Sequence, residues 1–308
     1  MANPVLTTPT YAGEFAGKYL SAALLSANTL DKGLITIMPN VKYKSVLQVG
    51  SYNDIVADAT CAFTASGTLT LSEKIITPKE FQVNVELCKS DLHASWEAEQ
   101  MGFSAHDHLA PSFADFVIAH TGAKVAAQLE NTIWSRQDGT AGEFDGFYYK
   151  ATAGGSGCVA VTGTGITATN VITEMGKVVD AIPQAVYGKE DVHIYVAPNV
   201  ARAYIRALGG FVATIGSNGV DGKGTTWFNG QGLSFDGIPV VVAQGLPASS
   251  MMAAQKSNMF FGTGLLNDSN QVALLDMAQL DGSQNVRVIM RYTATVEMGI
   301  NGDVVIYA

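Results

Sequence analysis

The chain has 308 residues, of which 47% are apolar and only 15% are charged, and its net charge is −9. This length allows one large or two medium domains with an ample core, and the low charged fraction predicts that part of the surface is buried in an assembly. An acidic chain without any run of Lys or Arg is not expected to be a dedicated nucleic-acid binder, which would present a basic face.

The cysteines and the first residues indicate a cytoplasmic origin. Cys61, Cys88 and Cys158 are widely spaced and form no CxxC pair, so we expect free thiols in a reducing compartment. The start, MANPVLTTPTY, lacks the basic and apolar parts of a signal peptide, and no apolar run reaches membrane-spanning length. The sequence therefore predicts a soluble protein with no membrane partner.

Residues 1–33 are predicted to form an arm, with an extended start containing Pro4 and Pro9, a helix over 11–27 and a break at 28–33. Residues 34–88 then predict a long two-stranded ribbon, because apolar and polar residues alternate over 41–48 and 81–87 and turn residues lie between them. A ribbon of two strands has too little core to be stable alone. We therefore expect it to lie on a neighbouring subunit.

A short helix is expected from Ser90 to Gly102, followed by a long helix over Pro111–Trp134 with Ser112 as its N-cap. Gly122 within the long helix suggests that another backbone passes close to it. Such a helix is stable only when sheets pack along it. Its buried face is predicted to comprise Phe113, Phe116, Val117, His120, Ala123, Ala126, Ala127 and Ile133.

Residues 136–167 read as a glycine-rich loop, and an α/β unit follows over 168–243. Within this unit we expect a helix over 168–182, a strand over 192–197, a helix from an Asn199 cap to Leu208, an exposed loop over 211–232 and a strand over 238–243. The remaining strands are predicted near 250–254, 258–261, 271–277, 285–300 and 303–307. The fold class that follows is α+β.

No motif predicts a catalytic, cofactor-binding or metal site, and we expect no cofactor. His106-Asp107-His108 has no third ligand placed by its spacing. Gly163-Thr164-Gly165, Gly222-Lys223-Gly224 and Gly155-Ser156-Gly157 each depart from the dinucleotide, phosphate-loop or nucleophile-elbow pattern that they approach. Asn267-Asp268-Ser269 matches a glycosylation sequon, but no secretory signal accompanies it.

The order of these elements resembles the major capsid protein of tailed bacteriophages, which has the Hong Kong 97-type fold. Local sequence carries the resemblance too. Residues 79–102 (KEFQVNVELCKSDLHASWEAEQMG) and 111–134 are similar to the passage from ribbon to spine helix. Residues 171–208 are similar to the start of the axial domain, and 233–247, 258–266 and 286–307 are similar to its end.

The resemblance implies an N-terminal arm (1–33), an extended β-ribbon loop (34–88), a peripheral domain with the spine helix (89–150), an α/β axial domain (151–265) and returning strands (266–308). It implies a non-enzymatic subunit that self-assembles into pentamers and hexamers of an icosahedral-type shell around double-stranded DNA. The implied partners are copies of itself, a portal, scaffolding and minor or decoration capsid proteins, with only weak, non-specific DNA contact. The implied location is the virion capsid, after assembly in the host bacterial cytoplasm.

Two family features are not expected here. An arm that begins at Met1 predicts no proteolytic trimming and a separate scaffolding protein. Lys42, Lys44 and Lys74 lie on or near the ribbon, but nothing fixes the Asn or the acid that a Lys–Asn cross-link would need. Three alternatives stay open: an encapsulin-like compartment of the same fold, a cytoplasmic α/β enzyme with a polar site in 168–243, and a tail or decoration component.

Overall fold

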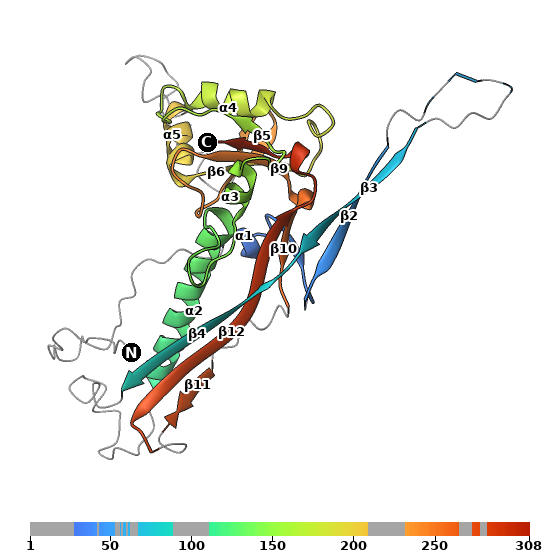
Figure 1. Ribbon diagram of the computed structural model, residues 1–308. Helices are drawn as coiled ribbons and strands as arrows, with labels where there is room; N and C mark the ends of the chain where they lie inside the picture. The colour runs from blue at the N-terminus through green and yellow to red at the C-terminus, as the bar shows by residue number, and fades with distance from the viewer. Residues whose placement is uncertain are drawn as a thin grey trace, which may run out of the picture.

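The computed structural model of the protein describes residues 28–41, 43–52, 56, 58, 59, 61, 67–88, 111–208, 232–264, 273–277 and 282–308. These residues form two sheets, a long helix and a two-stranded ribbon that projects from the body (Figure 1). The predicted helices over 11–27 and 90–102 and nearly all of the loop 211–232 lie outside the described residues.

Five strands form a sheet around β12 (Asn285–Met298). Strands β4 (Lys79–Cys88) and β11 (Ala273–Asp276) pair antiparallel with opposite edges of β12, since Val286 pairs with a residue of each. β10 (Met259–Gly262) pairs with the last part of β12, and β1 (Thr36–Met38) adds a parallel strand beyond β10. Even-numbered side chains of β12 are buried on the side of the long helix α2 (Pro111–Trp134), whereas Arg287 and Arg291 on the other face are exposed.

Six strands form a second, mixed sheet whose central strands are buried almost throughout. Its order is β5 (Val159–Val161), β13 (Val305–Tyr307), β9 (Met251–Gln255), β6 (Val192–Val196), β8 (Ile238–Val242) and β7 (Leu233–Phe235). Helix α4 (Val171–Asp180) packs on β9, β13 and α5 (Pro198–Leu208), and α3 (Phe147–Thr152) joins α2 to this sheet. The short helices α1 (Asn28–Asp31), η4 (Lys256–Asn258) and η7 (Asn301–Asp303) lie in connections.

One continuous hydrophobic core joins the two sheets at the C-terminal end of α2. Trp134 is fully buried there, with its ring centroid 5.1 Å from that of Tyr195 in β6 and 5.7 Å from that of Phe147 in α3. Tyr195 Oη donates a 2.7 Å hydrogen bond to the carbonyl of Leu34, which leads into β1. The end of α2 therefore lies where both sheets and the N-terminal described segment meet.

The structure shortens the predicted ribbon of residues 34–88. Only β2 (Ser45–Tyr52) and β3 (Leu69–Ile76) pair as a separate two-stranded ribbon. β1 joins β10, and β4 joins β12 along its whole length, where Phe81 stacks on Tyr292 with 5.4 Å between ring centroids. The alternation over 81–87 was correctly identified as a strand, but Phe81 on its apolar side is buried in the body of its own chain, while Val83 and Leu87 are half-buried and Val85 is exposed.

Two residues predicted as N-caps, Ser112 and Asn199, lie inside their helices. The long helix has the predicted bounds, but it includes Ser112 and begins at Pro111, and α5 likewise begins at Pro198, not after an Asn199 cap. Proline suits the first turn of a helix because its missing N–H would have no partner there. The Asn199 side chain instead exchanges two 3.1 Å hydrogen bonds with Ser249.

The predicted buried face of α2 is partly wrong. Ala127 and Ile133 are buried, but Ala123 is exposed, and the helix also buries Leu129 and Trp134. Residues 136–167, predicted as a loop, contain α3 and β5. β10 falls within the range predicted for the axial domain, yet it pairs with β12 of the five-stranded sheet.

Gly245 and Gly122 differ in whether the structure leaves room for a side chain at their position. A Cβ at Gly245 would lie 2.3 Å from the carbonyl oxygen of Glu130, so the chain after β8 rests directly on α2. At Gly122, where a close backbone was expected, the described residues place nothing within 4 Å of a Cβ.

We expect Gly245→Ala to lower the free energy of unfolding by about 1–3 kcal/mol, because the added methyl cannot fit against the helix backbone. Gly122→Ala is the matched control and should raise it by up to about 1 kcal/mol through helix propensity. Urea unfolding of the free subunit, followed by circular dichroism, measures both. A Gly245→Ala variant as stable as the parent would contradict this close packing.

Candidate assembly surfaces

The ribbon exposes apolar side chains that no second layer of the described residues covers. Its register pairs Val46 with Ile75 and Gly50 with Leu71, so these residues share one face. Val46, Leu69, Leu71 and Ile75 on that face are 48%, 47%, 66% and 50% exposed. We call this set the apolar ribbon face. Exposed apolar surface of this kind is a candidate docking site for another chain.

The root of the ribbon is fixed tightly to the body. Ile76 is buried, and its Cγ2 would lie 2.7 Å from a Cβ at Gly262, which only glycine tolerates. The Val41 N–H donates a 3.0 Å hydrogen bond to the carbonyl of Thr263. Further out, an open groove of about 340 Å³ separates residues 47–50 of β2 from the body. The ribbon is therefore anchored at its base and leaves its own subunit soon after.

The chain passes between the two sheets at η4 and again next to η7. Asn258 of η4 hydrogen-bonds to Ile300, the residue before η7. Its Nδ2 donates to the carbonyl of Ile300 and its Oδ1 accepts from the N–H of Ile300, both at 2.7 Å. A Cβ at Gly299 would lie 2.9 Å from this Oδ1. Nearby, Lys150 of α3 donates to Glu297 of β12 at 2.6 Å. These contacts fix the orientation of one sheet relative to the other.

Glu130 is a fully buried carboxylate on α2, and the described chain shows no cation paired with it. It accepts hydrogen bonds from the N–H and the hydroxyl of Thr29, at 3.2 Å and 2.5 Å, while Trp134 Nε1 donates to the same hydroxyl at 2.8 Å. Burial raises the pKa of Glu130, against the lowering effect of the Thr29 donors and with a small further increase from Asp31. The carboxylate thus holds the segment that leads into β1 against the end of α2.

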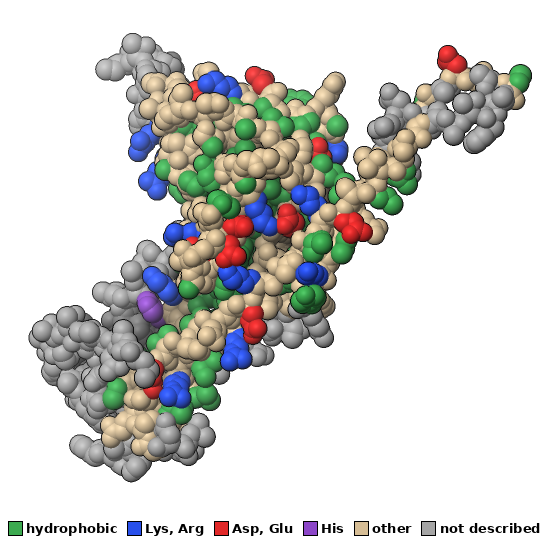
Figure 2. Space-filling view, viewed as in Figure 1, with side chains coloured by type: hydrophobic (Ala, Val, Ile, Leu, Met, Phe, Trp, Pro, Cys, Tyr) green, Lys and Arg blue, Asp and Glu red, His purple; other side chains and the backbone are tan. Residues whose placement is uncertain are grey.

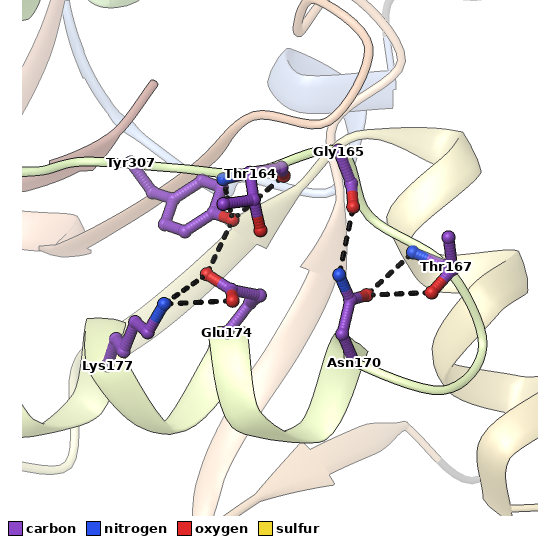
Figure 3. A network of polar contacts seen from close by, with 7 residues as sticks. All are labelled: Thr164, Gly165, Thr167, Asn170, Glu174, Lys177 and Tyr307. Carbon is purple, nitrogen blue, oxygen red and sulfur yellow. Dashed lines mark hydrogen bonds and ion pairs between the residues drawn. The ribbon is translucent and has the colours of Figure 1, made fainter.

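A second buried acid holds the end of the chain (Figure 3). Glu174 of α4 accepts 2.9 Å hydrogen bonds from Lys177 and a 2.8 Å hydrogen bond from Tyr307 of β13. The Thr164 N–H donates to Tyr307 Oη at 2.9 Å. The bonds from Lys177 and then Tyr307 lower the pKa of Glu174, and burial raises the pKa of Tyr307.

This network explains the glycine motif at 163–165. A Cβ at Gly163 would lie 2.6 Å from the Tyr307 ring, so the glycine makes room for an aromatic side chain of the same protein. In the adjoining turn, Asn170 accepts from the Thr167 N–H at 2.7 Å and donates to the Gly165 carbonyl at 2.9 Å. The segment is a structural connection between β5 and α4.

The other sequence motifs are dispersed. Gly155 and Gly157 adopt positive φ angles in a turn, where Ser156 Oγ donates to the Ala151 carbonyl at 2.8 Å. Lys44 lies over the ring of Tyr43, with Nζ 5.3 Å from the ring centroid. His106–His108, Gly222–Gly224, Asn267–Ser269 and Lys42 lie outside the described residues.

Within the described ranges, no cluster of His, Cys, Asp or Glu could hold a metal ion. No helix in the same ranges is both long and apolar enough to cross a membrane. Cys61 is exposed, and Cys88 and Cys158 are half-buried.

Sequence reasoning missed the three polar side chains that fix the body: Glu130, Glu174 and Asn258. Glu130 and Glu174 each lie on the buried face of their helix, as the helical period of the buried residues indicates. This period is the sequence signal that could have identified them as buried acids. Asn258 precedes a strand with no such signal, because its partner is 42 residues away in sequence.

The comparisons with known proteins agree with this architecture. No protein-family model matches the chain, and no curated protein matches its sequence. Solved structures match in fold. The capsid of a native GTA particle is 13% identical and has a TM-score of 0.62, and the match covers 98% of this chain and 95% of that one.

Two further structures give the same result. The capsid of Myoviridae phage XM1 is 11% identical over 94% of each chain, with a TM-score of 0.59. The satellite phage P4 procapsid, which includes the size determination protein, is 10% identical over 94% of this chain and 92% of that one, with a TM-score of 0.56. The chain therefore has the α+β fold of phage capsid proteins.

Replacing Asn258 should loosen the junction between the sheets. In Asn258→Ala the N–H and the carbonyl of Ile300 lose their partner, and we expect a loss of about 2 kcal/mol in the free energy of unfolding. Asn258→Asp keeps one acceptor but faces the Ile300 carbonyl with a charge, so it should regain stability on acidification, when a protonated carboxyl can donate. Denaturant unfolding at several pH values measures this, and an Asp variant without any pH-dependent recovery would contradict the assigned bonds.

Glu130→Gln should change how stability depends on pH. Because the folded-state pKa of Glu130 is raised above its ordinary value of 4.5, the folded protein binds this proton more tightly than the unfolded chain does. The parent should therefore lose stability relative to Glu130→Gln as pH rises above the ordinary pKa of 4.5 towards the raised folded-state pKa. A constant difference between the two proteins across this range would show that Glu130 is not destabilised by burial.

Proposed function

We propose that this chain is the major capsid protein of a tailed phage, a non-enzymatic subunit that assembles into a closed shell around double-stranded DNA. The observation that carries the proposal is the apolar ribbon face, which is exposed on a subunit that otherwise buries its core. The near full-length match to phage capsid structures supports it. Such a surface is stable in water only when another copy covers it.

In this proposal, α2 is the spine helix and the five-stranded sheet belongs to the peripheral domain. The six-stranded sheet with α4 and α5 is the axial domain, which meets its copies in pentamers and hexamers. Ile172 and Tyr187 in this part are 49% and 52% exposed, which supports a contact surface there. Residues 1–33 act as the arm, and 266–308 return through both domains. The extended loop is the ribbon β2–β3, which lies across a neighbouring subunit.

The proposed partners are copies of the chain, a portal, scaffolding proteins and minor or decoration capsid proteins. The net charge of −9 supports only weak contact with packaged DNA, since a strongly basic lining would bind DNA before packaging. The shell assembles in the host cytoplasm and becomes the virion capsid.

Electron microscopy of particles purified from producing cells tests this function. We expect closed shells composed mainly of this chain, and DNA inside the native particles. Closed shells that enclose protein cargo and no DNA would instead identify an encapsulin-like compartment. Native particles whose shells lack this chain would overturn the proposal.

Shortening the ribbon should separate folding from assembly. Replacing residues 47–74 by Asn-Gly joins Val46 to Ile75, which are opposite each other in the register, through a two-residue hairpin turn and removes Leu69, Leu71 and Glu73. The variant should fold, with a melting temperature within a few degrees of the parent, because the core lies elsewhere. It should fail to form stable shells on a sucrose gradient. Normal shell yield from this variant would contradict the proposed role of the ribbon.

A further inference from the structure

The apolar ribbon face contains one acid. Glu73 lies opposite Gln48 in the register and two residues from both Leu71 and Ile75, so its carboxylate belongs to the same face. It is exposed and has no cation partner within the described chain. If another surface covers this face, Glu73 loses its water, and a desolvated carboxylate requires a cation close by. The covering surface should therefore be apolar and carry a Lys or Arg.

The open face of the five-stranded sheet has this composition along β12 and β11, whereas β4 adds polar residues to it, namely Glu80, Gln82, Asn84 and Glu86. Along β12 the odd-numbered residues Arg287, Ile289 and Arg291 point away from α2, and Leu275 of β11, which is 40% exposed, lies opposite Arg287. Figure 2 shows charged side chains of both signs along the outer surface of the body. A flat ribbon packs well on a flat sheet face, because the side chains of two sheets interdigitate across a single layer.

Of the two arginines, only Arg291 is available for a partner. Arg287 is 3.4 Å from Glu86 of the neighbouring strand, whereas exposed Arg291 has no acid partner in the described chain. The order of apolar and charged residues along a strand is therefore opposite on the two surfaces. The ribbon has an acid between two apolar residues, and β12 has an apolar residue between two bases.

Glu73 and Arg291 of the same subunit cannot meet. Only Thr77 and Pro78 separate β3 from β4, and Lys79 pairs with Ala294. On one side of this link β3 extends away from the body, and on the other side β4 extends along the five-stranded sheet, so the two strands lie nearly in line (Figure 1). With a rise of roughly 3.3 Å per residue, six residues to Glu73 and three to Arg291 place the two side chains about 30 Å apart.

We propose that Glu73 of one copy pairs with Arg291 of a second copy, and that one of the two apolar residues beside Glu73, Leu71 or Ile75, then covers Ile289 of that copy. This inference rests on the proposed shell function and identifies the receiving surface and the charge pair that sets the position of the ribbon on it. Apolar contact alone would allow the ribbon to slide along the sheet, while one ion pair selects one position.

A charge exchange tests the pair. Glu73→Arg and Arg291→Glu each place two like charges together, and each should reduce the yield of closed shells at least tenfold on a sucrose gradient. The double variant Glu73→Arg/Arg291→Glu restores opposite charges and should recover most of the yield. Ser72→Arg places the same side chain on the other ribbon face and is the control, with a yield close to that of the parent. Circular dichroism of each free subunit confirms that it is folded.

The pair is wrong if both single variants form shells as the parent does, or if the double variant stays as defective as either single variant. It is also wrong if Arg291→Glu leaves shell yield unchanged and only lowers the DNA content, since the sheet face would then meet the genome. These outcomes leave the proposed function intact, because the parent still forms shells. A parent protein that forms no shells in its native setting would instead refute the proposed function.

Discussion

The structure depends on how the end of α2 is buried. Trp134 has no exposed surface, and its ring contacts both β6 and α3, while Glu130 one turn earlier binds Thr29. The last turn of α2 thereby connects the five-stranded sheet, the six-stranded sheet and the segment entering β1. A buried carboxylate without a counter-ion is costly, and its hydrogen bonds to a single residue make the docking of that residue specific.

The body has side-chain contacts between distant parts of the chain that the ribbon lacks. These contacts are the reciprocal hydrogen bonds of Asn258, the Lys150–Glu297 pair and the Glu174–Tyr307 bond, and all are half-buried or buried. The ribbon has backbone pairing, but the described residues place no layer beneath it beyond its root. A subunit with a complete core and one incomplete extension is suited to an assembly, since the extension is completed only when copies meet.

Much of the fold could be predicted from the sequence because it follows local periodicity. The bounds of α2 and the positions of β6, β8 and β12 come directly from apolar spacing. What periodicity cannot give is the partner of a strand. The alternation of 79–88 fits a ribbon as well as a sheet strand, and only its pairing with β12 separates the two. The same limit hid β5, which has three residues and pairs with the last strand of the chain.

The candidate surfaces were less predictable than the fold. The ribbon could be expected on its neighbour because two strands lack a core, but which face is apolar depends on a register that the sequence leaves open. The helical period marks the positions of Glu130 and Glu174 as buried, but their partners Thr29 and Tyr307 could not be predicted because they are distant in sequence. Gly122, predicted to lie against a backbone, faces open space in the described chain.

The near-continuity of β3 and β4 has a mechanical consequence. A pull on the ribbon passes through Thr77 and Pro78 into β4 along the strand direction, and ten residue pairs join β4 to β12. Because the hydrogen bonds of an antiparallel pair are perpendicular to the strands, this load shears them together and does not open them one at a time. In the proposed shell, tension between subunits would thus be carried by the longest ladder in the described chain.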